Sequence, residues 1–119
     1  MITNFSEFTF PVTEDEKIIL PILIKGLSTK TKDNPIHSDE ICKRLNEYFK
    51  NSNIDIVLSG VRLRKLTNFL RSEGVLPIIA TSKCYYCSFD KLEIIKQIES
   101  LEDRANSILN SANGLKKFI

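Results

Sequence analysis

Apolar residues recur at helical spacing in four segments of the chain, and polar stretches separate these segments. The first helix is predicted over residues 13–27, where Thr13 and Glu16 have the spacing of a capping box. Pro21 lies inside this segment and is expected to kink the helix or to limit its first part. The predicted buried stripe consists of Ile18, Ile19, Ile22 and Leu23.

A second helix is predicted after the polar loop at residues 28–35. Ser38 is its expected N-cap, because Ile41, Leu45 and Phe49 follow at intervals of four residues. The residues "PIH" just before the cap are expected to add a short edge strand.

The third helix is predicted over residues 59–74. Ser59 is expected to cap its start, and Gly74 is expected to end it in the left-handed conformation that glycine favours. The apolar residues of this helix cluster on one face, and they are Leu63, Leu66, Phe69 and Leu70.

After Gly74 the pattern changes to that of extended chain. Two strands are predicted at residues 75–80 and 84–89, joined by a polar tip of Thr81, Ser82 and Lys83. Pro77 has no backbone N–H to donate, so the first strand should lie at a sheet edge or carry a bulge. A β-hairpin therefore follows directly on the third helix.

The last helix is predicted from Asp90 to Phe118, and its apolar residues repeat with gaps of four and three. This is the heptad spacing of a coiled-coil seam. The seam has two interpretations: pairing with a second copy of the chain in a parallel or antiparallel two-helix coiled coil, or packing back on its own domain. Its length favours a homodimer, with dimerisation residues Ile94, Ile98, Leu101, Ala105, Ile108, Ala112 and Leu115, followed by Ile119.

In chain order these elements are helix, short strand, helix, helix, hairpin and helix. This is the order of the winged helix-turn-helix fold, in which the third helix enters the major groove of DNA and the hairpin forms a wing beside it. We therefore expect a mainly α protein with a small β-hairpin. Residues 1–89 would form the winged-helix domain, and residues 90–119 a long C-terminal helix.

Charge varies along the chain although its total is only +2. Residues 1–40 carry a net charge of −3, residues 41–89 carry +5, and residues 90–119 carry zero. Positive charge is therefore concentrated in the segment that holds the third helix and the hairpin. A local basic region is the electrostatic feature expected of a phosphate-binding surface.

The polar face of the third helix carries side chains suited to reading bases. Arginine can donate two hydrogen bonds to guanine, and asparagine can pair with adenine. At the hairpin tip, a hydroxyl and a positive charge suit a sugar–phosphate edge. The candidate DNA-binding residues are Arg62, Arg64, Lys65, Thr67, Asn68, Arg71, Ser82 and Lys83, with Arg62 expected at the backbone rather than at bases.

The sequence also allows two other interpretations of this face. A helix that is apolar on one side and basic on the other is the ordinary pattern of a solvated surface helix. Winged-helix domains can also bind proteins instead of nucleic acid, because a fold does not determine a function. The neighbouring hairpin with its basic tip and the local charge excess favour DNA.

Three consecutive stretches, "VRLRKLTNFLRSEG", "PIIATSKCYYCSF" and "KLEIIKQIESLEDRANSIL", resemble small winged-helix proteins of bacteriophages and prophages over roughly residues 35–110. In that group an R-x-x-x-N-x-x-R-like helix precedes an I-x-S-S-x-K-G-Y-Y-like wing, and a helix containing S-L-x-x-R-A follows. The resemblance implies functional roles for Arg64, Asn68 and Arg71 on the reading helix and for Lys83, Tyr85 and Tyr86 in the wing.

This chain departs from the group at Cys84, where glycine is usual. Glycine would permit a positive φ at the hairpin turn, so a cysteine argues against a tight two-residue turn. Tyr85 and Tyr86 should alternate across the wing, one packing on the core and the other facing a sugar or a partner.

The cysteines and the histidine do not predict a metal site or a catalytic site. Cys84 and Cys87 should point to opposite faces of a strand, so we expect no zinc site with His37 and Cys42. Cys42 is expected to be a small buried residue, and His37 a loop or cap residue. The sequence has no nucleophile–base arrangement and no glycine-rich phosphate loop, so we expect neither an enzyme nor a cofactor.

No membrane association is expected either. The longest apolar run, "IILPILI" at residues 18–24, is much shorter than the roughly 20 residues of a membrane span. The N-terminal "MITNFSEF" lacks the basic start and apolar core of a signal peptide. The expected location is the cytoplasm of a bacterial host.

The leading hypothesis is a sequence-specific, homodimeric protein that binds double-stranded DNA, encoded by a phage or mobile element and acting in transcriptional regulation or replication. The alternative is a phage-encoded interaction module on the same scaffold that binds or inhibits a host or defence protein. A third interpretation is an adaptor in virion assembly.

Overall fold

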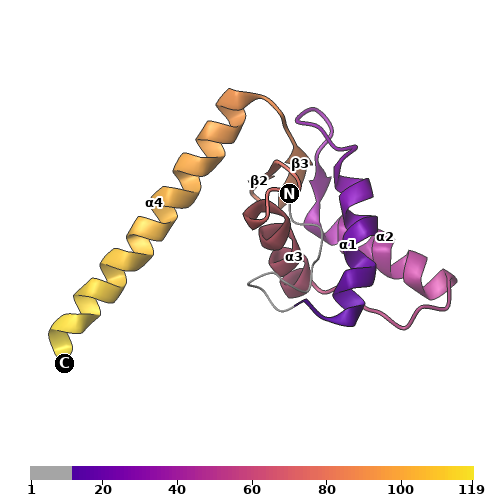
Figure 1. The fold of residues 1–119 in the computed structure, drawn as a ribbon, viewed down its shortest axis with the longest axis horizontal. Coiled ribbons are helices and arrows are strands. Elements are labelled where there is room, and N and C mark those ends of the chain that lie inside the picture. Colours follow the sequence, from indigo (N-terminus) through magenta and orange to yellow (C-terminus); the bar gives the residue numbers. More distant parts are fainter. Residues whose placement is uncertain (1–11) are drawn as a thin grey trace. The chain divides into compact units, whose positions relative to one another are not determined.

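The computed structural model describes residues 12–119 and divides into two compact units, Met1–Ser88 and Phe89–Ile119. The protein is mainly helical, with a small three-stranded antiparallel sheet and a long C-terminal helix (Figure 1). The N-terminal stretch "MITNFSEF", on which the expectation about a signal peptide depends, lies outside the described residues. None of the helices in residues 12–119 combines the length and the apolar character needed to cross a bilayer.

Helix α1 (Glu14–Leu27) begins with the predicted capping box. The Thr13 hydroxyl accepts from the backbone N–H of Glu16 at 3.2 Å, and Glu16 Oε1 accepts from the Thr13 N–H at 3.0 Å. The helix continues through Pro21, so it does not end early there. Ile18, predicted in the buried stripe, is 47% exposed, and its place in the core is taken by Leu20.

The predicted short strand is present as β1 (Ile36–His37), which leads into helix α2 (Ser38–Asn51). The predicted cap is wrong by one residue, because His37 caps the helix through Nδ1, which accepts from the Asp39 N–H at 3.1 Å. The backbone N–H of Ser38 instead donates to the carbonyl of Lys83 at 2.8 Å, which ties the start of α2 to the hairpin.

Helix α3 (Gly60–Ser72) has the predicted caps at both ends. The Ser59 hydroxyl accepts from the Arg62 N–H at 3.1 Å. Gly74 has a φ of +64°, and the N–H groups of Gly74 and Val75 donate to the carbonyls of Arg71 and Leu70. This is the Schellman arrangement, which requires a left-handed residue at the position of Gly74.

The hairpin consists of β2 (Ile78–Thr81) and β3 (Cys84–Cys87), and the sheet order is β1-β3-β2. Strand β2 lies at an edge, as predicted from Pro77. Thr81 pairs with Cys84, so the loop has only two residues, Ser82 and Lys83. The expectation of a longer turn was wrong, because Ser82, with a φ of +29°, adopts the positive φ and Cys84 remains in the strand.

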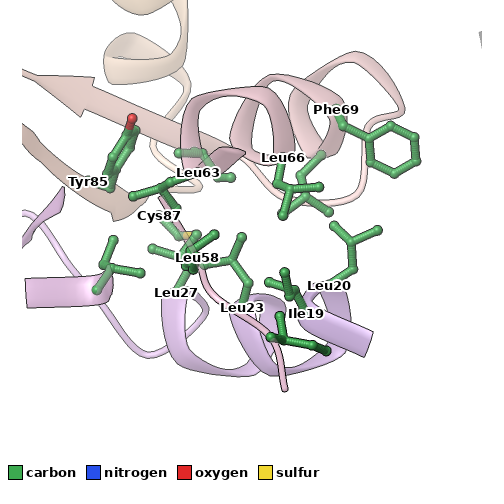
Figure 2. Packing of buried hydrophobic residues seen from close by; sticks show 14 of the residues in the cluster. Ile19, Leu20, Leu23, Leu27, Leu58, Leu63, Leu66, Phe69, Tyr85 and Cys87 are labelled. Atoms are coloured by element: carbon green, nitrogen blue, oxygen red, sulfur yellow. The ribbon is translucent and has the colours of Figure 1, made fainter. Parts of the chain in front are cut away.

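The core lies between the three helices α1, α2 and α3 and the sheet. Leu63, Leu66 and Phe69 of α3 are fully buried. Figure 2 shows leucines of α3 facing α1, with Leu58 and Cys87 between the two helices. Each fully buried leucine contributes on the order of 1.5–3 kcal/mol by leaving water, so this apolar face sets the orientation of α3. The side chains that α1 supplies are Ile19, Leu20, Leu23 and Leu27.

The second unit consists of α4 (Lys91–Leu115) and a short 3₁₀ helix, η2 (Lys116–Phe118). Asp90 caps α4 as predicted, since its Oδ1 accepts from the Leu92 N–H at 3.3 Å. The α-helical part ends three residues before the predicted end, at Leu115, directly after Gly114. No residue of α4 is buried, so its apolar seam is open to solvent.

Replacing Gly74 by alanine should destabilise the Met1–Ser88 unit by roughly 1–2 kcal/mol, because a side chain disfavours the left-handed backbone. A methyl group at Gly74 would meet no atom within 4 Å, so the cost is conformational. Urea denaturation of the full chain measures the loss. The matched control is Gly26→Ala inside α1, which also has open space and should gain roughly 0.5–1 kcal/mol.

Candidate nucleic-acid interface

The outward face of α3 carries Arg64 and Asn68, which are both exposed. Thr67, expected on this face, is instead 2% exposed, and its hydroxyl donates to the carbonyl of Arg64 at 3.0 Å. It follows Leu63 by four residues, so it lies only about 40° from that leucine on the helix. The prediction for Thr67 was therefore wrong, because this position belongs to the packed side.

Two of the predicted basic residues turn toward α1 and meet a buried carboxylate. Lys65 Nζ lies 2.8 Å from Glu16 Oε1, and Arg62 Nε lies 3.5 Å from Glu16 Oε2. Arg62 also donates from Nη1 to the carbonyl of Val57 at 3.1 Å. The side chain of Glu16 is only 3% exposed. Arg62 and Lys65 thus hold α3 on α1, and the one carboxylate offsets one of their two positive charges.

The environment of Glu16 favours its ionised form. Burial raises the pKa of this carboxyl, but the hydrogen bonds from Lys65 and the Thr13 backbone and the charges of Lys65 and Arg62 together lower it below its ordinary value. The carboxylate is therefore charged at neutral pH. It both completes the capping box of α1 and pairs with two cations from α3.

Arg71 is half-buried at the end of α3. Its Nε donates to the carbonyl of Ile78 at 3.0 Å, so it ties the helix to the first residue of β2. This contact gives Arg71 a structural role in fixing the hairpin to α3. The sequence pattern alone had assigned it to base contact.

Arg64 and Lys83 lie on different elements but line the same open hollow. The hollow has a volume of about 290 Å³ and is lined by Ser38, Asp39, Gly60, Arg64, Lys83 and Tyr85. Within residues 12–119, Arg64 and Lys83 form no ion pair, in contrast to Arg62 and Lys65. A guanidinium and an ammonium at one hollow suit an anionic group such as a phosphodiester. Asp39 places one carboxylate at the same rim.

A backbone hydrogen bond positions the hairpin tip beside the start of α2. The bond from the Ser38 N–H to the Lys83 carbonyl holds the turn against α2 and leaves the Lys83 side chain exposed. Ser82 at the turn is also exposed. Tyr85 and Tyr86 are both buried, at 9% and 6% exposed, so neither faces outward as one of them was expected to do.

Two positioning residues were not identified from the sequence. Asn46 of α2 accepts from the Leu58 N–H at 2.7 Å and donates to the Leu58 carbonyl at 3.1 Å, which fixes the connector just before α3. Glu16 was recognised only as a cap. The sequence offered one signal for each residue: Asn46 is a polar residue next to Leu45, and Glu16 is a carboxylate at the start of an apolar stripe.

The surroundings of Cys42 and Cys87 do not activate these thiols as nucleophiles. Burial raises the pKa of Cys87, and burial together with the charge of Asp39 raises the pKa of Cys42, so both thiols are protonated at neutral pH and weakly nucleophilic. His37 acts as a helix cap. In the part of the chain that the structure describes, no group of three or more His, Cys, Asp or Glu residues could hold a metal ion.

Comparison of the chain with protein-family models, with curated proteins and with solved structures finds no match. Functional inference therefore depends on the geometry of the chain itself.

Replacing Glu16 by glutamine should destabilise the protein by about 1–3 kcal/mol, because a buried, charge-assisted contact with Lys65 is lost. Chemical denaturation at pH 7 measures the change. The matched control is Glu14→Gln in the same helical turn, whose exposed pair with Lys17 should contribute less than about 1 kcal/mol. Equal losses for the two variants would show that the buried ion pair has no special role.

The contribution of Glu16 should depend on pH in a defined direction. Its native pKa is lowered from an ordinary value of 4.5, so its stabilisation is complete above that pH and is lost as the pH falls through the lowered native pKa. The difference in unfolding free energy between the wild type and Glu16→Gln should therefore shrink from pH 6 to about pH 3. A difference that stays constant over this range would contradict the assignment.

Proposed function

We propose that the protein binds double-stranded DNA in a sequence-specific manner, with α3 in the major groove and the β2–β3 hairpin as a wing. The observation that carries the proposal is the convergence of Arg64 and Lys83 on one open hollow. Asn68 is exposed one helical turn beyond Arg64, so two side chains able to read bases share one face.

The topology of the Met1–Ser88 unit supports a winged helix-turn-helix. Three helices precede a hairpin, and β1 pairs with β3 to give the sheet order β1-β3-β2. In such a fold the third helix and the hairpin contact the same segment of a duplex. Arg71 and the Ser38–Lys83 hydrogen bond would hold the hairpin and α3 in a fixed relation before binding.

The contacts would divide between base reading and backbone anchoring. We assign base contacts to Arg64 and Asn68, and phosphate or sugar contacts to Ser82 and Lys83. Arg62 and Lys65 are paired with Glu16, so their contribution to the local field is reduced. Arg71 and Thr67 would act through the packing of α3 rather than by touching DNA.

A homodimer formed through α4 would bring two such surfaces to one duplex and favour a palindromic site. Each copy would add its own phosphate contacts, so binding should weaken steeply with salt. The resemblance to small phage and prophage winged-helix proteins suggests transcriptional regulation or replication of a mobile element, in the cytoplasm of a bacterial host.

A second candidate is an interaction module that binds a host or defence protein on the same scaffold. Two apolar residues favour it: Val57 in the connector before α3 and Val61 in the first turn of α3 are 68% and 70% exposed. Apolar groups next to a charged rim are typical of protein interfaces. This candidate predicts no salt-dependent DNA binding.

The double variant Arg64→Ala/Asn68→Ala should lose about 1–3 kcal/mol of specific binding energy for each base contact that is removed. The measurement selects preferred duplexes from a random-sequence pool and then titrates them by fluorescence anisotropy at two salt concentrations. Lys83→Ala should instead weaken binding to all duplexes by a similar factor, because a phosphate contact carries no sequence information.

The matched control is Lys25→Ala, which removes one positive charge from an exposed position on α1. It should change affinity only slightly and leave sequence preference unchanged. If the double variant enriches the same sequences with the same affinity as the wild type, the assignment of α3 to base reading is wrong. An anisotropy signal that stays flat at low salt would instead support the protein-binding candidate.

A further inference from the structure

Helix α4, considered by itself, displays an apolar seam that no other part of the helix covers. The exposed fractions of Ile98, Ile108 and Leu115 are 47%, 63% and 69%. An exposed row of large apolar groups marks an interaction surface. Ile94 to Leu115 keep the heptad spacing in α-helical conformation, whereas Ile119 lies beyond η2. The residues available for a helix pair are therefore those from Ile94 to Leu115.

Side-chain size along the seam is uneven, and this restricts how a second copy can pair with it. In a parallel, in-register dimer each residue faces its own copy. Layers of two alanines at Ala105 and Ala112 would then alternate with a layer of two isoleucines at Ile108. The two alanine layers would be underfilled, and the isoleucine layer between them would be crowded. Helix pairs pack well only when every layer is filled to a similar volume.

We propose that α4 pairs antiparallel with α4 of a second copy, about a two-fold axis between Asn106 and Ser107. In this register each alanine faces a large residue of the other chain: Ala105 opposes Ile108, and Ala112 opposes Leu101. The outer layers pair Ile98 with Leu115. Every layer then contains either one small and one large residue or two large residues at the ends, so the two helices can approach evenly along the seam.

The distribution of charge along the helix supports the same orientation. Residues 90–106 contain five acidic and three basic residues, a net charge of −2, and residues 107–119 contain two basic residues and no acidic one, a net charge of +2. An antiparallel pair places the acidic half of one helix beside the basic half of the other, and it also opposes the two helix dipoles. A parallel pair places like charges together.

The orientation determines where the two chains enter the helix pair. In the antiparallel register the Cα atoms of the two Lys91 residues lie about 46 Å apart, at opposite ends. A parallel pair would place them side by side. The inference rests on the proposed homodimer but not on DNA binding, so the two can fail separately.

Disulfide trapping distinguishes the orientations. The variants Ala105→Cys and Ile108→Cys are prepared separately in the full chain, mixed under mild oxidation, and the linked peptides are identified by mass spectrometry. This readout separates the new linkage from any formed by Cys42, Cys84 or Cys87, which are free thiols. We expect linkage between positions 105 and 108 in roughly tenfold excess over self-linkage of Ala105→Cys, because only facing Cβ atoms reach disulfide distance.

The control variant is Asn106→Cys, which lies outside the seam and should link poorly in either orientation. Sedimentation equilibrium of the wild type runs in parallel and should show a dimer at tens of micromolar. Efficient self-linkage of Ala105→Cys would overturn the antiparallel arrangement but would still support a homodimer. A wild type that stays monomeric would overturn both, whatever the result of the DNA titration.

Discussion

The rotation of α3 about its own axis is the constraint on which the rest of the candidate site depends. Leu63 and Leu66 are fully buried against α1, and the carboxylate of Glu16 receives Lys65 and Arg62 at the edge of the same contact. The apolar burial supplies most of the free energy, while the ion pairs specify one angle, because a buried carboxylate tolerates only positions that satisfy its oxygens. With the angle set, Arg64 and Asn68 face outward.

The remaining parts of the site are held by hydrogen bonds to backbone groups, and the side chains that would act are not used in them. The Lys83 carbonyl is bound by Ser38, both polar groups of Leu58 are bound by Asn46, and the Ile78 carbonyl is bound by Arg71. This arrangement leaves the side chains of Lys83 and Arg64 exposed while fixing the segments that carry them. A surface organised in this way can bind an anion without first reorganising, which lowers the entropic cost of binding.

The two units differ in whether they bury their own apolar side chains. The Met1–Ser88 unit buries its large apolar side chains within itself, so its helices and its sheet depend on one another. The Phe89–Ile119 unit consists of α4 and η2, neither of which has a buried residue, and the apolar seam of α4 is exposed. Small and large residues alternate along the seam and charge changes sign along the helix. Both features favour the antiparallel pairing that we propose.

Local chemistry alone was enough to predict the helices, the short strand, the hairpin, three of the four N-caps and the glycine that ends α3. A cap such as Thr13 or Ser59 and a left-handed glycine at Gly74 depend only on neighbouring residues. The pairing of Lys65 with Glu16, 49 residues earlier, and the burial of Thr67 and of both tyrosines were decided by tertiary packing. Helical periodicity gives the angle between two side chains. Which side of a helix is buried depends on the segments that pack against it, and these are distant in the chain. No local pattern contains that information.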